Sequence, residues 1–170
     1  MSNKKKVFGL LILVIWVVII FLFSGSDASS STAQTQVALN ILSNIAEKNT
    51  FVNSLLIKLN ENHTIFYSIR KLAHLTVFCI LQIISFSIFR TFGKSFLTSA
   101  IYSLLIVFGY ASFDEIHQYF VPGRSCQFTD VLIDTLGGLV GLTICSITLT
   151  IKNIFKSILN KFKSKKDIIE

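Results

Sequence analysis

The feature that most constrains this chain is an unbroken apolar run close to the N-terminus. The seventeen residues 7–23 include no charged, hydroxyl or amide side chain. A helix of this length rises about 26 Å, close to the hydrocarbon thickness of a bilayer at roughly 30 Å. The run is also longer than the apolar part of a typical cleaved signal peptide. It therefore predicts a retained transmembrane helix, with cleavage near Ala28 as the alternative.

Three further apolar stretches of similar length follow, at residues 72–89, 95–113 and 131–151. The chain of 170 residues is 52% hydrophobic and only 15% charged, with a mean hydropathy of +0.66. This composition is too apolar for an ordinary soluble domain of the same size. A single proline leaves the stretches free to be helical. We therefore predict an all-α, polytopic membrane protein with four transmembrane helices in contact with the lipid bilayer.

The segments between the apolar stretches divide the chain further. After a Ser- and Thr-rich linker, Ile41, Leu55 and Leu59 recur at helical spacing among polar residues, which predicts an outer amphipathic segment. Lysines alternate with Ile and Phe after residue 151, which predicts a basic amphipathic helix, with a solvated tail as the alternative for its last residues. The predicted parts are a first transmembrane helix with its basic N-terminus (1–23), an extracytoplasmic linker and amphipathic segment (24–69), a three-helix region (70–151) and a basic cytoplasmic tail (152–170).

The basic residues lie beside the apolar stretches, although the formal net charge of +7 would also suit nucleic acid. They form no patch with interleaved aromatic residues, which argues against a nucleic-acid partner. If the N-terminus is cytoplasmic, eleven of the sixteen basic residues fall inside, as expected for cytoplasmic segments. We therefore predict that both termini are cytoplasmic. The eleven residues are Lys4, Lys5, Lys6, Arg90, Lys94, Lys152, Lys156, Lys161, Lys163, Lys165 and Lys166.

The chain has few of the residues and motifs that mark cofactor sites. Cys79, Cys126 and Cys145 form no C-x-x-C pair and have no histidine at zinc-site spacing. Their odd number argues against a complete disulfide framework. No nucleophile motif and no Gly-rich phosphate loop occurs. We therefore expect no metal and no cofactor, and we assign no catalytic residue; the oligomeric state stays open.

The most informative polar residues lie where the last three predicted helices share one end. Charged groups beside a bilayer core are costly unless they are paired or hydrated. With alternating topology, the second helix starts, the third ends and the fourth starts at the same outer end, so their polar residues can meet. Pro122-Gly123 predicts a turn that aims Arg124 toward the acids. We call the predicted functional set the outer cluster; its members are Lys71, His74, Asp114, Glu115, Gln118, Arg124, Asp130 and Asp134.

Other polar residues and glycines carry weaker predictions. Gln82 and Ser85 lie within the second apolar stretch, and we expect them to hydrogen-bond to a neighbouring helix. Gly137 and Gly141 form a Gly-x-x-x-Gly pattern, which allows close contact between helices. His117 lies on a different side of the helix from the outer cluster, so we expect an exposed loop histidine there.

The order and spacing of the polar residues resemble the VanZ-like family of bacterial envelope proteins over residues 70–141. The family commonly has Asn where this chain has Asp134, which adds a negative charge here. The resemblance implies a multi-pass protein of the bacterial cytoplasmic membrane. Because the founding member is associated with teicoplanin resistance, it also implies an influence on glycopeptide susceptibility or on the handling of cell-wall components. The matching elements are Lys71-x-x-His74, Asp114-Glu115-x-x-Gln118, Pro122-x-Arg124, and Asp130 with Asp134 and Gly137.

Four interpretations of the outer cluster remain open. Its charges would hold helix ends together, although polar contacts between membrane helices average only about 0.6 kcal/mol. Alternatively, its bases would bind an anionic or sugar-bearing group of a cell-wall precursor or glycopolymer. A membrane enzyme acting on a lipid-linked phosphate or cell-wall precursor would use His74 or an acid as general base, with Asp114 and Asp130 around a divalent ion. Transport has the least support, because four short spans show no repeat.

Overall fold

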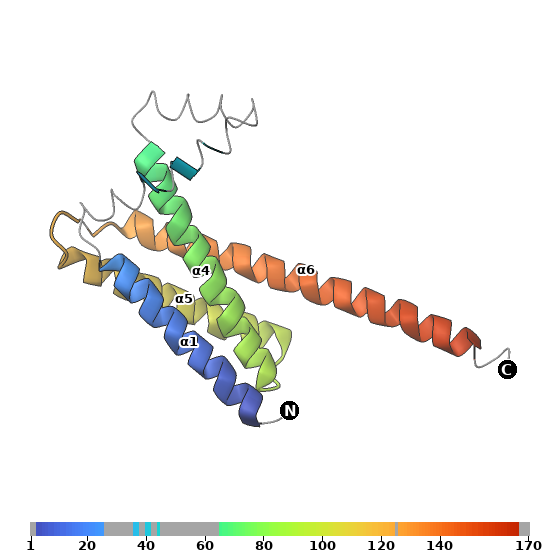
Figure 1. Cartoon of the computed structure of the whole chain (residues 1–170). Coiled ribbons are helices and arrows are strands. Elements are labelled where there is room, and N and C mark those ends of the chain that lie inside the picture. The colour runs from blue at the N-terminus through green and yellow to red at the C-terminus, as the bar shows by residue number, and fades with distance from the viewer. Residues whose placement is uncertain are drawn as a thin grey trace.

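The computed structural model describes residues 3–25, 36, 37, 40, 41, 44, 65–124 and 126–166. Each of its four long helices is long and apolar enough to cross a membrane, and the described residues include no strand. The predicted all-α architecture with four transmembrane helices is therefore confirmed. The predicted outer amphipathic segment lies outside the described residues, apart from a few isolated positions. The long helices are α1 (Asn3–Ser24), α4 (Ile65–Thr91), α5 (Phe96–Tyr119) and α6 (Phe128–Lys166) (Figure 1).

The outer surface of the bundle is apolar. In α1 only Ile20 and Ser24 are buried, and large side chains such as Phe8 and Leu22 are each 65% exposed. A soluble protein rarely presents so large a continuous apolar surface. Lipid tails cover such a surface without cost, so the exposed residues are those expected of helices in a bilayer.

Helix α1 runs antiparallel to α4. Gly9, near the start of α1, lies against Ile88, near the end of α4. Further along, the Trp16 Nε1–H group donates a hydrogen bond of 3.0 Å to the Val77 carbonyl. From the first contact to the second, the residue number rises in α1 and falls in α4, as expected for antiparallel helices. The Trp16 indole packs against α4, and its N–H group has a hydrogen-bond partner there.

Helix α5 returns along α4 after a short turn. Ser95 caps its N-terminus, because the Ser95 side chain accepts a hydrogen bond of 3.1 Å from a backbone N–H three residues on. The Gln82 Nε2 group donates to Ser103 Oγ across the interface at 2.7 Å, which confirms the interhelical bond predicted for Gln82. The prediction for Ser85 is wrong: its buried hydroxyl has no hydrogen-bond partner among the described residues.

Helices α4 and α6 run parallel and touch through glycine. A Cβ atom at Gly137 would collide with the Leu75 carbonyl, and one at Gly141 would lie 2.5 Å from the Cys79 carbonyl oxygen. From the Gly137–Leu75 contact to the Gly141–Cys79 contact, the residue number rises by four in each helix. The helices therefore run in the same direction at this crossing. The predicted close contact at the two glycines is therefore confirmed, and it depends on backbone meeting backbone.

Helix α6 continues well beyond the predicted fourth span. It is one helix of 39 residues, which corresponds to about 58 Å of rise. No glycine or proline follows residue 151, and the lysines and aliphatic residues there are compatible with continued helix. Residues 151–161 are exposed on all sides, and Figure 1 shows this end extending away from the other helices. Its position relative to a membrane surface stays a prediction.

Candidate functional site

The helix directions bring four helix ends together. Helices α1 and α5 end where α4 and α6 begin, and we call this the site end. At the opposite end, the Lys6 ammonium group lies 5.1 Å from the centre of the Phe92 ring. A polar cavity of about 170 Å³ opens between α4, α5 and α6 at the site end. Its lining residues are Arg70, Lys71, His74, Glu115, Gln118, Gly123, Arg124, Gln127, Asp130, Ile133 and Asp134.

Gln118 connects three charged groups at the wall of this cavity. Its Oε1 atom accepts hydrogen bonds from Arg70 Nη2 at 3.2 Å and from Arg124 Nη1 at 3.1 Å. Its Nε2 atom donates to Asp114 Oδ2 at 2.9 Å, one helical turn back along α5. Gln118 is 2% exposed. Two guanidinium groups from different segments therefore converge on one neutral oxygen.

The loop between α5 and α6 turns back over the cavity. Gly123 has a φ of +77°, in the left-handed region that favours glycine, and Arg124 N donates to the Val121 carbonyl at 3.2 Å. The predicted turn is therefore confirmed, and it directs Arg124 to the wall of the cavity. Beyond the turn, Gln127 N donates to Glu115 Oε1 at 2.7 Å, which ties the loop to α5.

A salt bridge and a contact between a histidine and an aspartate join α4 to α6. Lys71 Nζ lies 2.7 Å from Asp130 Oδ1, and about one turn further along, His74 Nδ1 lies 3.6 Å from Asp134 Oδ2. Both pairs follow the parallel register that the glycine crossing sets, since Gly137 contacts α4 at the next residue after His74. The crossing therefore determines which acid meets which base.

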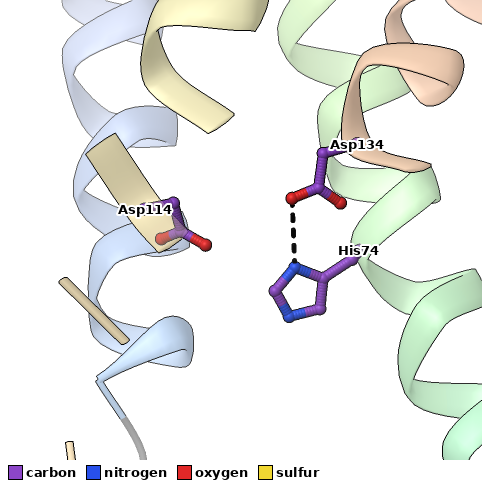
Figure 2. Close-up of side chains that lie close together, drawn as sticks. All are labelled: His74, Asp114 and Asp134. Atoms are coloured by element: carbon purple, nitrogen blue, oxygen red, sulfur yellow. Dashed lines mark ion pairs between the residues drawn. The ribbon is translucent and has the colours of Figure 1, made fainter. Parts of the chain in front are cut away.

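His74, Asp114 and Asp134 come from three different helices and lie close together (Figure 2). One ligand atom from each residue lies within 4.8 Å of the other two. Asp114 is 1% exposed and Asp134 is 2% exposed. In each, the Oδ1 atom has no hydrogen-bond partner among the described residues. One imidazole and two carboxylates in this arrangement have the donor types that bind divalent cations.

A family model described as VanZ/LLP1 matches residues 8–150. The chain belongs to this family. The match covers most of α1, all of α4 and α5, and much of α6, so it extends well beyond the polar residues. No match was found among curated proteins or among solved structures. The VanZ/LLP1 family and the four apolar helices together identify a multi-pass membrane protein.

The structure places seven of the eight outer-cluster residues of this VanZ/LLP1 chain at one cavity. The eighth, Asp114, is bonded to Gln118 in the cavity wall. The outer cluster as predicted left out two lining residues that make specific contacts, Arg70 and Gln127. Arg70 had a signal, since it lies four residues before His74 and so on the same side of a helix. No sequence signal pointed to Gln127, because its contact with Glu115 uses the backbone N–H group, which every residue except proline has.

One weaker prediction for the VanZ/LLP1 chain is wrong. His117 is half-buried within α5, and its ring stacks on Phe21 of α1 with centroids 4.2 Å apart. The prediction of an exposed loop histidine failed because α5 continues to Tyr119 and because α1 covers that side of it. His117 therefore joins α1 to α5 at the site end and does not line the cavity.

Proposed function

We propose that this VanZ/LLP1 protein lies in the bacterial cytoplasmic membrane, with both termini in the cytoplasm and the cavity facing outwards. We further propose that the cavity binds an anionic group of a cell-wall component or of its lipid-linked precursor, and thereby influences teicoplanin susceptibility. The observation that carries this proposal is the convergence of Arg70 and Arg124 on the neutral Gln118 oxygen.

The charge arrangement supports an anionic ligand. Guanidinium groups bind phosphate and carboxylate oxygens through paired N–H donors, and such charge-assisted bonds are roughly twice as strong as neutral ones. Gln118 supplies one neutral acceptor between the two guanidinium groups, so an anion that reaches them gains stronger bonds than the amide provides. The acids of the lining, including Glu115, suit the hydroxyl donors of a sugar.

The size of the cavity supports a head group as the ligand. The cavity has a volume of about 170 Å³, and most of its lining side chains are polar or charged. This space holds a phosphate or carboxylate group with part of a sugar, and it is much too small for a glycopeptide antibiotic. An effect on teicoplanin would therefore act through a wall component.

Drug susceptibility of a glycopeptide-sensitive Gram-positive host tests the proposal. The host would express wild type, Arg124→Ala or Arg124→Lys at matched membrane levels, and teicoplanin and vancomycin would be compared. We expect protection against teicoplanin from wild type and its loss in both variants, because lysine keeps the charge without the planar fork. Arg90→Ala is the matched control, since Arg90 is exposed at the opposite end. Absence of protection by wild type, or full protection by Arg124→Ala, would contradict the proposal.

The alternative function is a membrane enzyme acting on a lipid-linked phosphate or cell-wall precursor. The contact of His74 with Asp134 favours it, because a carboxylate beside an imidazole orients a general base. Phosphate release from a lipid-linked pyrophosphate by purified protein in detergent would test it. Turnover that is lost in His74→Gln, at unchanged expression and folding, would support the enzyme.

A further inference from the structure

We infer that His74, Asp114 and Asp134 together bind one divalent transition-metal ion, which nothing in the family match assigns. The inference goes beyond the proposed function, because metal binding can be measured in the absence of any wall component. All three belong to the outer cluster, but the sequence did not single them out as one set of ligands, since they lie on three helices and are 20 or more residues apart.

The distance between the donor atoms of His74 and Asp134 fits a shared ion, and Asp114 would move closer to complete the site. Two ligands at about 2.1 Å from an ion with tetrahedral geometry lie about 3.4 Å apart. The separation of 3.6 Å between His74 Nδ1 and Asp134 Oδ2 is close to this value and is long for a direct hydrogen bond. The Asp114 carboxylate offers its ligand atom within 4.8 Å of both. Figure 2 shows the three side chains extending from their helices toward one another.

The two carboxylates also carry unsatisfied atoms. Oδ1 of Asp114 and Oδ1 of Asp134 are buried and have no hydrogen-bond partner among the described residues. Buried carboxylate oxygens are strongly destabilising unless a proton donor or a cation satisfies them. The nearest ammonium group on α4, that of Lys71, is in a salt bridge with Asp130. A divalent ion held by the two aspartates and His74 compensates the charge of both buried carboxylates at once.

The residues around the three ligands are suited to hold them in place. Gln118 Nε2 donates to Asp114 Oδ2, which leaves Oδ1 for the ion and fixes the carboxylate plane. Hydrogen bonds of this kind to ligand carboxylates are typical of metal sites. Because the same Gln118 accepts from Arg70 and Arg124, an ion held by Asp114 is linked through one side chain to the arginines of the cavity.

The donor set indicates the class of ion. Imidazole favours Zn²⁺ and other late transition metals, whereas carboxylates alone favour Mg²⁺, Ca²⁺ or Mn²⁺. One nitrogen and two oxygen donors therefore suit Zn²⁺ or Mn²⁺. Three protein ligands leave a coordination position for water or a ligand oxygen. Since His74 and Asp134 line the cavity, an ion between them borders the space proposed for the anionic group.

Metal content of the purified full-length chain tests the inference. The protein would carry Cys126→Ser, which removes the exposed thiol, and would be purified in detergent through a tag that contains no histidine. After dialysis against Zn²⁺ and then metal-free buffer, we expect one Zn²⁺ per chain by elemental analysis. Asp114→Asn and Asp134→Asn should each weaken Zn²⁺ binding at least about tenfold. Even substitutions of residues that only hydrogen-bond to metal ligands typically lower the metal affinity by that factor.

Glu115→Gln provides the matched control, because it removes another buried carboxylate at the site end that lies outside the three-residue group. We expect it to retain Zn²⁺. Wild type without bound metal, or equal binding by wild type and both aspartate variants, would overturn the inference. Loss of metal in Glu115→Gln with retention in the aspartate variants would also overturn it.

A measurement on the wild-type ligands avoids any dependence on variant folding. The chain loaded with Mn²⁺ alone should show, in pulsed electron paramagnetic resonance, modulation from a single imidazole nitrogen. Bound Mn²⁺ without nitrogen coupling would exclude His74 as a ligand. Neither result depends on drug susceptibility, so failure of this inference and failure of the proposed function are distinguishable.

Discussion

At the scale of single residues, the site end depends on a neutral side chain placed among charges. Gln118 can both accept and donate, so it bonds to two guanidinium groups and a carboxylate at the same time. A carboxylate there would repel Asp114, and an ammonium group would repel the arginines. The amide is therefore the side chain that lets opposite charges share a small buried volume.

Replacing this amide should destabilise the protein measurably. Gln118→Leu leaves the arginine N–H groups and Asp114 Oδ2 without their bonds, and each buried group left unsatisfied costs about 1–3 kcal/mol. We expect a decrease of at least that size in the free energy of unfolding, measured by denaturation from detergent micelles. Gln127→Leu is the control, since its side chain is exposed and surface substitutions usually stay within about 0.5 kcal/mol. Equal stability of the two variants would show that the Gln118 bonds contribute little.

The sequence was sufficient to predict which polar residues would gather, but not how they would pair. Because consecutive helices alternate in direction across the membrane, the polar ends of three helices lie together, however each helix is rotated about its own axis. The pairing of Asp130 with Lys71, and of Asp134 with His74, depends on the register between α4 and α6. That register is a tertiary property, so the sequence could not show that the group within 4.8 Å of one another would be His74, Asp114 and Asp134.

At the scale of helices, the apolar stretches predicted the number of elements and their approximate positions. The ends were missed because an apolar stretch marks the part of a helix inside lipid, whereas backbone hydrogen bonding continues past it. Thus α4 begins at Ile65, before the predicted start at residue 72, and α5 ends at Tyr119, beyond residue 113. The added turns contain half of the outer cluster, namely Lys71, Asp114, Glu115 and Gln118.

The contact of α4 with α6 should tolerate no side chain at its glycines. Gly137→Ala and Gly141→Ala place a methyl group against the α4 backbone, and overpacking of this kind costs about 1–3 kcal/mol. We expect lower unfolding free energies for both variants in the same detergent assay. Gly109→Ala is the control, because nothing lies within 4 Å of the added Cβ and alanine favours helix by about 1 kcal/mol. A Gly137→Ala protein as stable as Gly109→Ala would show that the crossing adapts.

At the scale of the whole molecule, the proposed orientation predicts a pattern of chemical labelling. Cys126 is exposed at the site end, whereas Cys79 and Cys145 are buried. A membrane-impermeant maleimide should therefore label Cys126 in intact cells. In a Cys126→Ser background, Lys94→Cys at the opposite end should be labelled only after the cells are broken. The reverse pattern would place the cavity in the cytoplasm and remove the proposed contact with wall components.

The glycine crossing lies close to one end of α6 and far from the other. From the midpoint of the crossing, at residue 139, the helix rises about 7.5 Å to Asp134 and about 33 Å to Lys161. The crossing therefore lies close to the cavity end of α6 and far from its basic end, which extends away from the other helices (Figure 1). A rigid tilt of α6 about that midpoint that moves Asp134 by about 1 Å displaces Lys161 by about 4 Å. What occupies the cavity and where the lysines stand on the other side are therefore geometrically coupled.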